Sequence, residues 1–245
     1  MNLPPKFTSK IFIITAVFLG VAFAVPVMAQ TDAPSVSGEL KERAKTLRQN
    51  VTTQIKTERD DIKAKRAELN IQLKNEREAA KKRLEAAREE AKKAAETRRA
   101  ELKDKISKLR DEKKKQIAAR LDEQLARLNV KWTDHFNNVL NRLSEILSKM
   151  ELRADKIQAD GKDVSAARTA IVNAKTAIES ARAAVETQAK KTYTATFSSE
   201  TELGAAFKAV REQFHEDLFG LRDGAMKSAR EAAQNALQAL KSIPI

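Results

Sequence analysis

The 245-residue chain contains no cysteine, only six glycines and five prolines, and few aromatic residues. Without cysteine it can form neither a disulfide nor a thiolate metal site, so its stability has to come from helix packing. The scarcity of glycine and proline leaves few places for tight turns, and no glycine-rich phosphate loop is present. These absences favour long, uninterrupted helices over loop-rich or disulfide-rich folds.

Charged residues make up 33% of the chain, and Lys plus Arg outnumber Asp plus Glu by 47 to 34, which gives a net charge of +13. Ala, Lys, Glu, Arg and Leu dominate, a composition typical of long helices and coiled coils. The basic surplus favours polyanionic partners such as an acidic wall polymer or an anionic membrane surface. Solubility alone is the alternative explanation of the same charge.

Residues 1–29 have the three parts of a secretory signal peptide. Lys6 and Lys10 form a basic start, residues 11–25 are almost entirely apolar, and Val27 and Ala29 precede a cleavage site before Gln30. We therefore predict an exported protein that is periplasmic, cell-surface or secreted, with a polar linker over residues 30–38. An uncleaved membrane anchor is the alternative, because the apolar run is just long enough to span a bilayer.

An eleven-residue repeat of apolar residues runs through the next part of the chain, where no Gly or Pro occurs between Glu39 and Ala159. This repeat predicts one long, nearly straight helix with a single apolar seam, because eleven residues per three turns is close to the α-helical period. The seam positions are Leu40, Val51, Ile62, Leu73, Leu84, Ala95, Ile106, Ile117, Leu128, Val139 and Met150.

The aromatic residues of the predicted mature chain all lie in residues 131–245. We expect this part to be a helical bundle, with one helix beginning near Asp163 after a cap at Gly161 and another beginning near Leu203. Residues 39–130 are then a charged coiled-coil rod. The predicted fold is all-α: a very long N-terminal helix, coiled-coil-like with an eleven-residue repeat, that runs into a C-terminal three-helix antiparallel bundle.

The apolar seam of the rod has no partner within the chain in this topology, because the later helices are too short to reach it. The seam residues Leu73, Leu84, Ile106 and Ile117 are therefore candidates for self-association through the rod.

A second eleven-residue series consists of arginines, namely Arg66, Arg77, Arg88, Arg99 and Arg110. One interpretation is that their stems cover the narrow apolar seam while their charged heads stay in water. The other is a ladder that contacts an extended polyanion. The rod has no aromatic residue on which a base could stack, which disfavours nucleic acid as the polyanion.

No catalytic, cofactor or metal site is recognisable. The two histidines, His135 and His215, have no second histidine or carboxylate at metal-ligand spacing on their own helices. No nucleophile stands beside a base, and no cysteine is present. We therefore expect a non-enzymatic protein without cofactors.

The stretches "RADKIQADGKDVSAARTAIVNAKTAI" and "KTYTATFSSETEL" resemble a group of uncharacterised exported helical proteins of candidate-phylum bacteria, over roughly residues 130–243. That resemblance implies export and a helical bundle, and no assigned function. In its signal peptide, basic charge and long charged helices the chain is also similar to the Skp/OmpH-type periplasmic chaperones. Those chaperones have a β-rich trimerisation body, and this chain has no set of strands to build one.

Two functions follow as hypotheses. The first is an exported coiled-coil spacer or scaffold, or interaction protein, at the cell envelope. The alternative is a basic holdase-like chaperone or a protein that binds a polyanion such as a wall polymer or anionic lipid. The two differ in salt dependence, because binding through Lys and Arg weakens steeply as salt rises.

Overall fold

The computed structural model describes residues 36–244. The predicted signal peptide and residues 30–35 of the predicted linker lie outside these residues. Five helices account for most of the described chain, and no strand occurs in it, so the all-α prediction is confirmed. They are α1 (Val36–Ser107), α2 (Glu112–Ala159), α3 (Ser165–Ala189), α4 (Leu203–Asp223) and α5 (Ala225–Lys241).

The very long N-terminal helix is confirmed, but the prediction that it continues without interruption to Ala159 is wrong. α1 ends at Ser107, and α2 begins at Glu112 after a short turn. Asp111 caps α2, because its carboxylate accepts hydrogen bonds from the backbone N–H groups of Lys113 and Lys114 at 2.8 and 3.3 Å. Glu200, ninety positions further along the chain, accepts a hydrogen bond from the Arg110 N–H at 3.1 Å.

The chain therefore folds back on itself at residues 108–111, and the predicted boundary between rod and bundle at residues 130 and 131 falls inside α2. Among the described residues, the chain divides into two units between Thr53 and Gln54, within α1.

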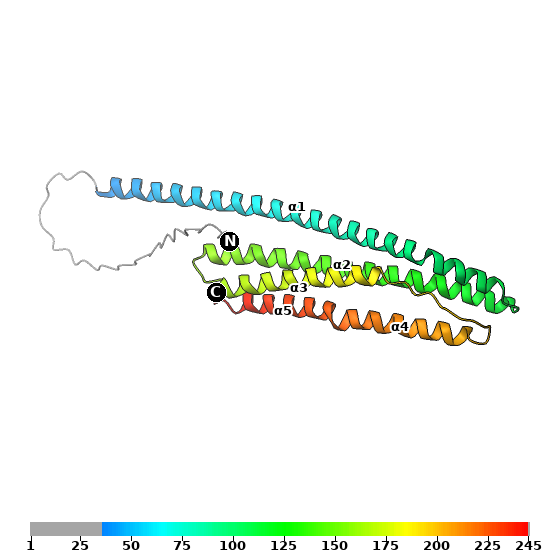
Figure 1. Cartoon of the computed structure of the whole chain (residues 1–245). Helices are drawn as coiled ribbons and strands as arrows, with labels where there is room; N and C mark the ends of the chain where they lie inside the picture. Colours follow the sequence, from blue (N-terminus) through cyan, green and yellow to red (C-terminus); the bar gives the residue numbers. More distant parts are fainter. Residues whose placement is uncertain (1–35, 245) are drawn as a thin grey trace, which may run out of the picture. The chain divides into compact units, whose positions relative to one another are not determined.

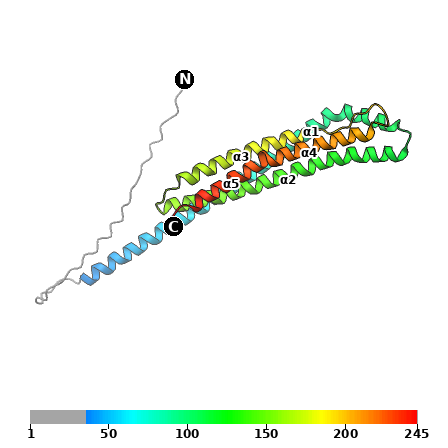
Figure 2. The ribbon, with the colours of Figure 1, turned by 90° about the horizontal axis from the view of Figure 1, so that it is seen from below.

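The antiparallel three-helix bundle is formed by α2, α3 and the run of α4 and α5, which lie side by side in Figures 1 and 2. Large and small side chains alternate along the buried face of α3 and let the neighbouring helices approach closely. The buried residues of this face are Ala167, Ile171, Ala174, Ile178, Ala181 and Val185.

Two glycines shape the ends of the bundle helices. Gly161 takes a positive φ of 79° in the turn between α2 and α3, as its predicted role as a cap requires. Gly224 lies between α4 and α5, and a Cβ atom there would come within 2.8 Å of the Gly220 carbonyl oxygen. Glycine therefore permits the last two helices to join as one bent helix.

The segment that connects α3 to α4 is extended, and its side chains alternate between buried and more exposed positions. Tyr193, Ala195 and Phe197 are buried. Ala195 and Phe197 pack in a small core with Leu102 of α1 and Phe207 of α4. The connection thus helps to hold the end of α1 against the bundle.

Candidate interaction surfaces

The three central arginines of the eleven-residue series lie on α1 and are paired with carboxylates of α2. Arg77 forms an ion pair with Glu145, and Arg88 contacts Asp134 at 2.8 Å. Arg99 comes within 4.0 Å of Asp122. Asp122, Asp134 and Glu145 are twelve and eleven positions apart along α2. This spacing matches the eleven-residue spacing of the arginines, and the pairs run in opposite sequence order because α1 and α2 are antiparallel.

Arg88 has the most complete set of partners. One of its nitrogens, Nη2, donates to Thr133 Oγ1 and Asp134 Oδ1 at 2.8 Å each and to the Val130 carbonyl at 3.1 Å. The Thr133 side chain is fully buried. This guanidinium therefore links α1 to a single turn of α2.

Burial also affects the carboxylate at the far end of the series. It raises the pKa of Asp122, and the nearby positive charges of Arg99 and Lys103 only partly oppose this.

The other two arginines of the series are placed differently. The side chains of Arg66 and Arg110 are exposed, and neither has an ion pair among the described residues. The five arginines therefore do not form one continuous free ladder, because intrachain carboxylates engage the central three.

The proposed self-association seam is divided in a similar way. Leu84 and Ile106 are 3% and 8% exposed and belong to the cores of the folded chain. Leu73 is partly buried, and Ile117 is 57% exposed. The assumption that this seam lacks an intrachain partner was wrong, because the fold-back at residues 108–111 brings α2 and α3 alongside α1.

The seam is uncovered at the beginning of α1. Every residue from Leu40 to Glu68 is exposed. The large apolar residues in this stretch are Leu40, Leu47, Val51, Ile55 and Ile62, which are 40–64% exposed. We call them the open stripe. Leu40, Val51 and Ile62 belong to the eleven-residue repeat, but the candidate seam predicted from the sequence lies further along the chain.

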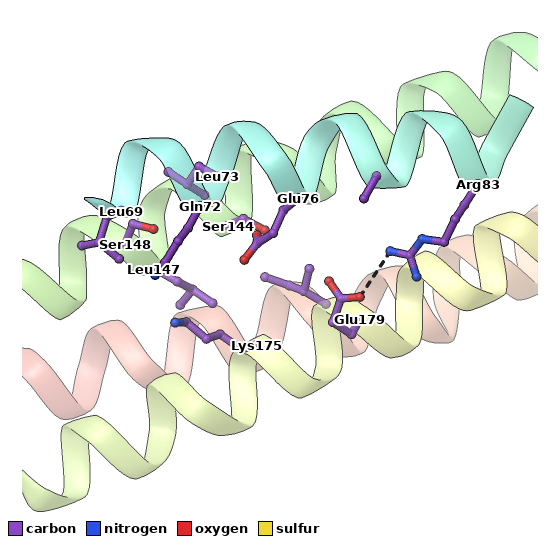
Figure 3. A pocket seen from close by; sticks show the side chains of 12 residues that line it. Leu69, Gln72, Leu73, Glu76, Arg83, Ser144, Leu147, Ser148, Lys175 and Glu179 are labelled. Atoms are coloured by element: carbon purple, nitrogen blue, oxygen red, sulfur yellow. Dashed lines mark ion pairs between the residues drawn. The ribbon is translucent and has the colours of Figure 1, made fainter. Parts of the chain in front are cut away.

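A cleft of about 330 Å³ opens between α1, α2 and α3 (Figure 3). Leu69, Leu73 and Leu147 give it apolar walls, and Arg83 and Glu179 approach to 3.6 Å across it. Lys175, another lining residue, contacts Glu151 at 2.7 Å. Apolar walls crossed by ion pairs suit helix packing, and no nucleophile with an adjacent base lines this cleft.

Arg182 lies close to this cleft and is only 2% exposed. Its guanidinium donates to Asn137 at 3.0 Å and Ser144 at 3.3 Å, and it lies 3.3 Å from Glu179. Burial lowers the pKa of Arg182 despite the nearby carboxylates. The side chain ties α3 to α2, and nothing in its spacing along the sequence indicated burial.

A buried polar network fixes the connection between α3 and α4. Gln188 donates to Asn129 Oδ1 at 3.1 Å and to the Tyr193 hydroxyl at 2.7 Å, and that hydroxyl donates to Asp217 at 2.7 Å. Burial and the Asp217 carboxylate raise the pKa of Tyr193, so the hydroxyl stays protonated. Lys191 completes the network with a 2.6 Å contact to Asp217.

The histidines occupy exposed positions. His135 lies beside Trp132 and Phe136, and His215 lies beside Phe214 and Phe219. Within residues 36–244, no group of three or more His, Cys, Asp or Glu side chains is arranged to hold a metal ion. None of the described helices is long and apolar enough to cross a membrane.

The chain matches no protein-family model, no curated protein and no solved structure. The resemblances to exported candidate-phylum proteins and to the Skp/OmpH-type chaperones therefore stay predictions.

Proposed function

We propose that the protein is a non-enzymatic scaffold or spacer at the cell envelope, exported by its N-terminal segment. The observation that carries this proposal is the contrast within α1. Its later part contributes Leu84, Leu102 and Ile106 to the folded cores, whereas residues 40–68 are exposed and present an apolar stripe. A helix with this division can join a folded body to a separate contact surface.

The pairing of the central arginines supports a scaffold over the polyanion-binding alternative. Arg77, Arg88 and Arg99 are engaged by carboxylates of α2, so these charges are not free to neutralise a polymer. The net charge of +13 still favours the alternative, and salt dependence separates the two functions.

The test has two arms. In the first, the full-length chain is expressed in a bacterial host, the cells are fractionated, and the mass of the purified protein is measured. We expect an extracytoplasmic protein that begins at Gln30. An unprocessed protein in the cytoplasm would contradict export.

In the second arm, the purified protein is sedimented at two salt concentrations with and without an acidic wall polymer. A scaffold that associates through apolar surface keeps its association as salt rises, and the polymer does not sediment with it. Polymer binding that weakens steeply with salt would instead establish the polyanion-binding function.

A further inference from the structure

We propose that residues 65–107 of α1 exchange between two copies of the chain, as in domain swapping. The turn at residues 108–111 straightens, α1 and α2 join into one helix, and this part of α1 packs on α2 and α3 of the second copy. The inference deepens the proposed function and rests on it, because it names a second copy as a partner of the scaffold. All the residues that carry it lie in the unit from Gln54 onward.

The first argument is the register of α1 against α2. In every ion pair between these two helices, the two residue numbers add up to between 220 and 222, so the helices are antiparallel in one register centred on residues 110 and 111. Two joined helices from two copies, related by a two-fold axis at that centre, have the same register. Each pair can then form between chains as it does within one. The pairs are Lys65 with Asp155, Arg77 with Glu145, Arg88 with Asp134 and Arg99 with Asp122.

The second argument is the last arginine of the eleven-residue series. Arg110 follows Arg99 by eleven residues, and its side chain is exposed and has no ion pair within residues 36–244. In the shared register it lies opposite Asp111 of the second copy, which precedes Asp122 by eleven residues. Within one chain, Arg110 and Asp111 are neighbours in the turn and cannot face each other from opposite helices. The exchanged dimer therefore gains two ion pairs at its centre, one from each arginine.

The third argument is that the sequence of the turn is compatible with a helix. Residues 108–111 contain neither Gly nor Pro, and the apolar repeat passes through them in phase, from Ile106 to Ile117. The apolar side chain of the turn, Leu109, is 7% exposed and packs in the small core with Leu102. In a joined helix these two leucines are seven residues apart and share one face, so Leu109 stays on the apolar side.

Few hydrogen bonds hold the turn in its folded-back form. Asp111 caps α2 at 2.8 and 3.3 Å, and Glu200 accepts a hydrogen bond from the Arg110 N–H at 3.1 Å. Joining the helices replaces the cap with backbone hydrogen bonds from each N–H to the carbonyl four residues before it. The contacts of α1 with α2 and α3 keep their chemistry in both forms. The free-energy difference is therefore confined to the turn, and protein concentration decides between monomer and dimer.

Cysteine cross-linking distinguishes the two forms, and the natural chain has no cysteine to interfere. Arg77→Cys and Glu145→Cys are suitable sites, because these paired side chains are 42% and 40% exposed and their replacement costs little stability. The two full-length variants are purified separately, mixed, and refolded together from urea at tens of micromolar. We expect a short bis-maleimide to link one variant to the other. Neither should link to itself, since the two sites are about 100 Å apart along the joined helix.

A double variant, with Arg77→Cys and Glu145→Cys in one chain, measures the proportion of the two forms. Its cysteines link within the chain in the folded-back monomer and between chains in the exchanged dimer. Links within the chain alone, together with a monomer by sedimentation at tens of micromolar, would overturn the exchange. These readouts use purified protein and no fractionation, so a failure of export and a failure of exchange are distinguishable.

A proline tests whether the turn straightens. Glu112 is the first residue of α2, and Asp111 before it has extended backbone angles, φ −87° and ψ 111°, so Glu112→Pro fits the folded-back form. In a joined helix the same proline removes a backbone hydrogen bond and clashes with the Lys108 carbonyl. Glu112→Pro should therefore weaken dimer formation at least about 100-fold, whereas the matched control Glu112→Ala should leave it unchanged. Equal association of the two variants would show that the dimer keeps its turn, which contradicts the exchange.

A charge reversal tests the register at the centre of the dimer. Arg110→Glu places a carboxylate opposite Asp111 of the second copy and should weaken association about tenfold. Arg98→Glu is the matched control, since Arg98 is an exposed arginine of α1 without an ion pair in the described part of the chain, and it should leave association nearly unchanged. Equal association of the Arg110→Glu and Arg98→Glu variants would contradict the proposed register.

Discussion

Leu84 and Ile62 occupy the same position of the eleven-residue repeat on the same helix, yet they have different surroundings. Leu84 is 3% exposed and packs in the main core, whereas Ile62 is 40% exposed. The apolar repeat is continuous through both, so it specifies which face of α1 is apolar and not what covers that face. In the covered part the cover is the chain's own α2 and α3, whereas at Ile62 the same face is exposed.

The largest effect is expected from shortening the two side chains just compared, Leu84 and Ile62. Leu84→Ala should lower the free energy of unfolding by about 2–5 kcal/mol, because it leaves a cavity in a packed core. Ile62→Ala should lower it by less than about 1 kcal/mol when the protein is dilute enough to be monomeric. Urea unfolding followed by Trp132 fluorescence measures both. Equal losses in the two variants would show that the open stripe is covered within the monomer.

The second prediction uses the small residues of the seam. Ala95 is fully buried, so Ala95→Leu should cost about 1–3 kcal/mol through overpacking. Ala44 is exposed, so Ala44→Leu should leave the stability of the fold nearly unchanged. Urea unfolding of the two variants checks this. A destabilised Ala44→Leu monomer would indicate that Ala44 is packed.

The repeat and composition predicted the all-α fold and the apolar face of α1, because both depend on local periodicity. The fold-back was not predictable in the same way. The turn at residues 108–111 contains neither Gly nor Pro, and the only local signal is Asp111 before a helix. Its other support comes from Glu200, which is distant in sequence and close only in the folded chain.

The contacts of the arginine series and of the polar network were likewise not predictable, because their partners are distant in sequence. The arginine series was visible in the sequence, but its partners Asp122, Asp134 and Glu145 become recognisable only when α2 lies antiparallel to α1. The polar network around Gln188 and Tyr193 combines two helices and an extended segment, so no single periodic pattern reveals it.

The third prediction concerns these arginines. Arg88→Gln should lower the free energy of unfolding by about 1 kcal/mol, because it removes charge-assisted hydrogen bonds to α2. Arg66→Gln is the matched change on an exposed arginine of the same series and should have almost no effect. Helix content by circular dichroism should be the same for both variants, since Gln and Arg have similar helix propensity. Equal stability of the two variants would mean that the Arg88 contacts contribute nothing.

The smallest expected effect is on the pH dependence of stability. It concerns Asp155 of α2, which pairs with Lys65 where the exposed part of α1 ends. Burial alone would raise the pKa of Asp155, but hydrogen bonds and ion pairs from Lys65 and Arg168 outweigh it and hold the pKa below its usual value. A carboxyl with a lowered pKa stabilises the fold above its unfolded pKa of about 4, and this contribution is lost as the pH falls below that value. Asp155→Asn should therefore lose less stability on acidification than the natural chain.

Asp122 provides the control of opposite sign, because burial raises its pKa. Its ionisation opposes folding as the pH rises through and above about 4, so Asp122→Asn should gain stability relative to the natural chain between acid and neutral pH. Urea unfolding at several pH values between about 3 and 7 measures both slopes. If the two variants shift the pH dependence in the same direction, the contact of Lys65 and Arg168 with Asp155 does not stabilise the junction between the open and covered parts of α1.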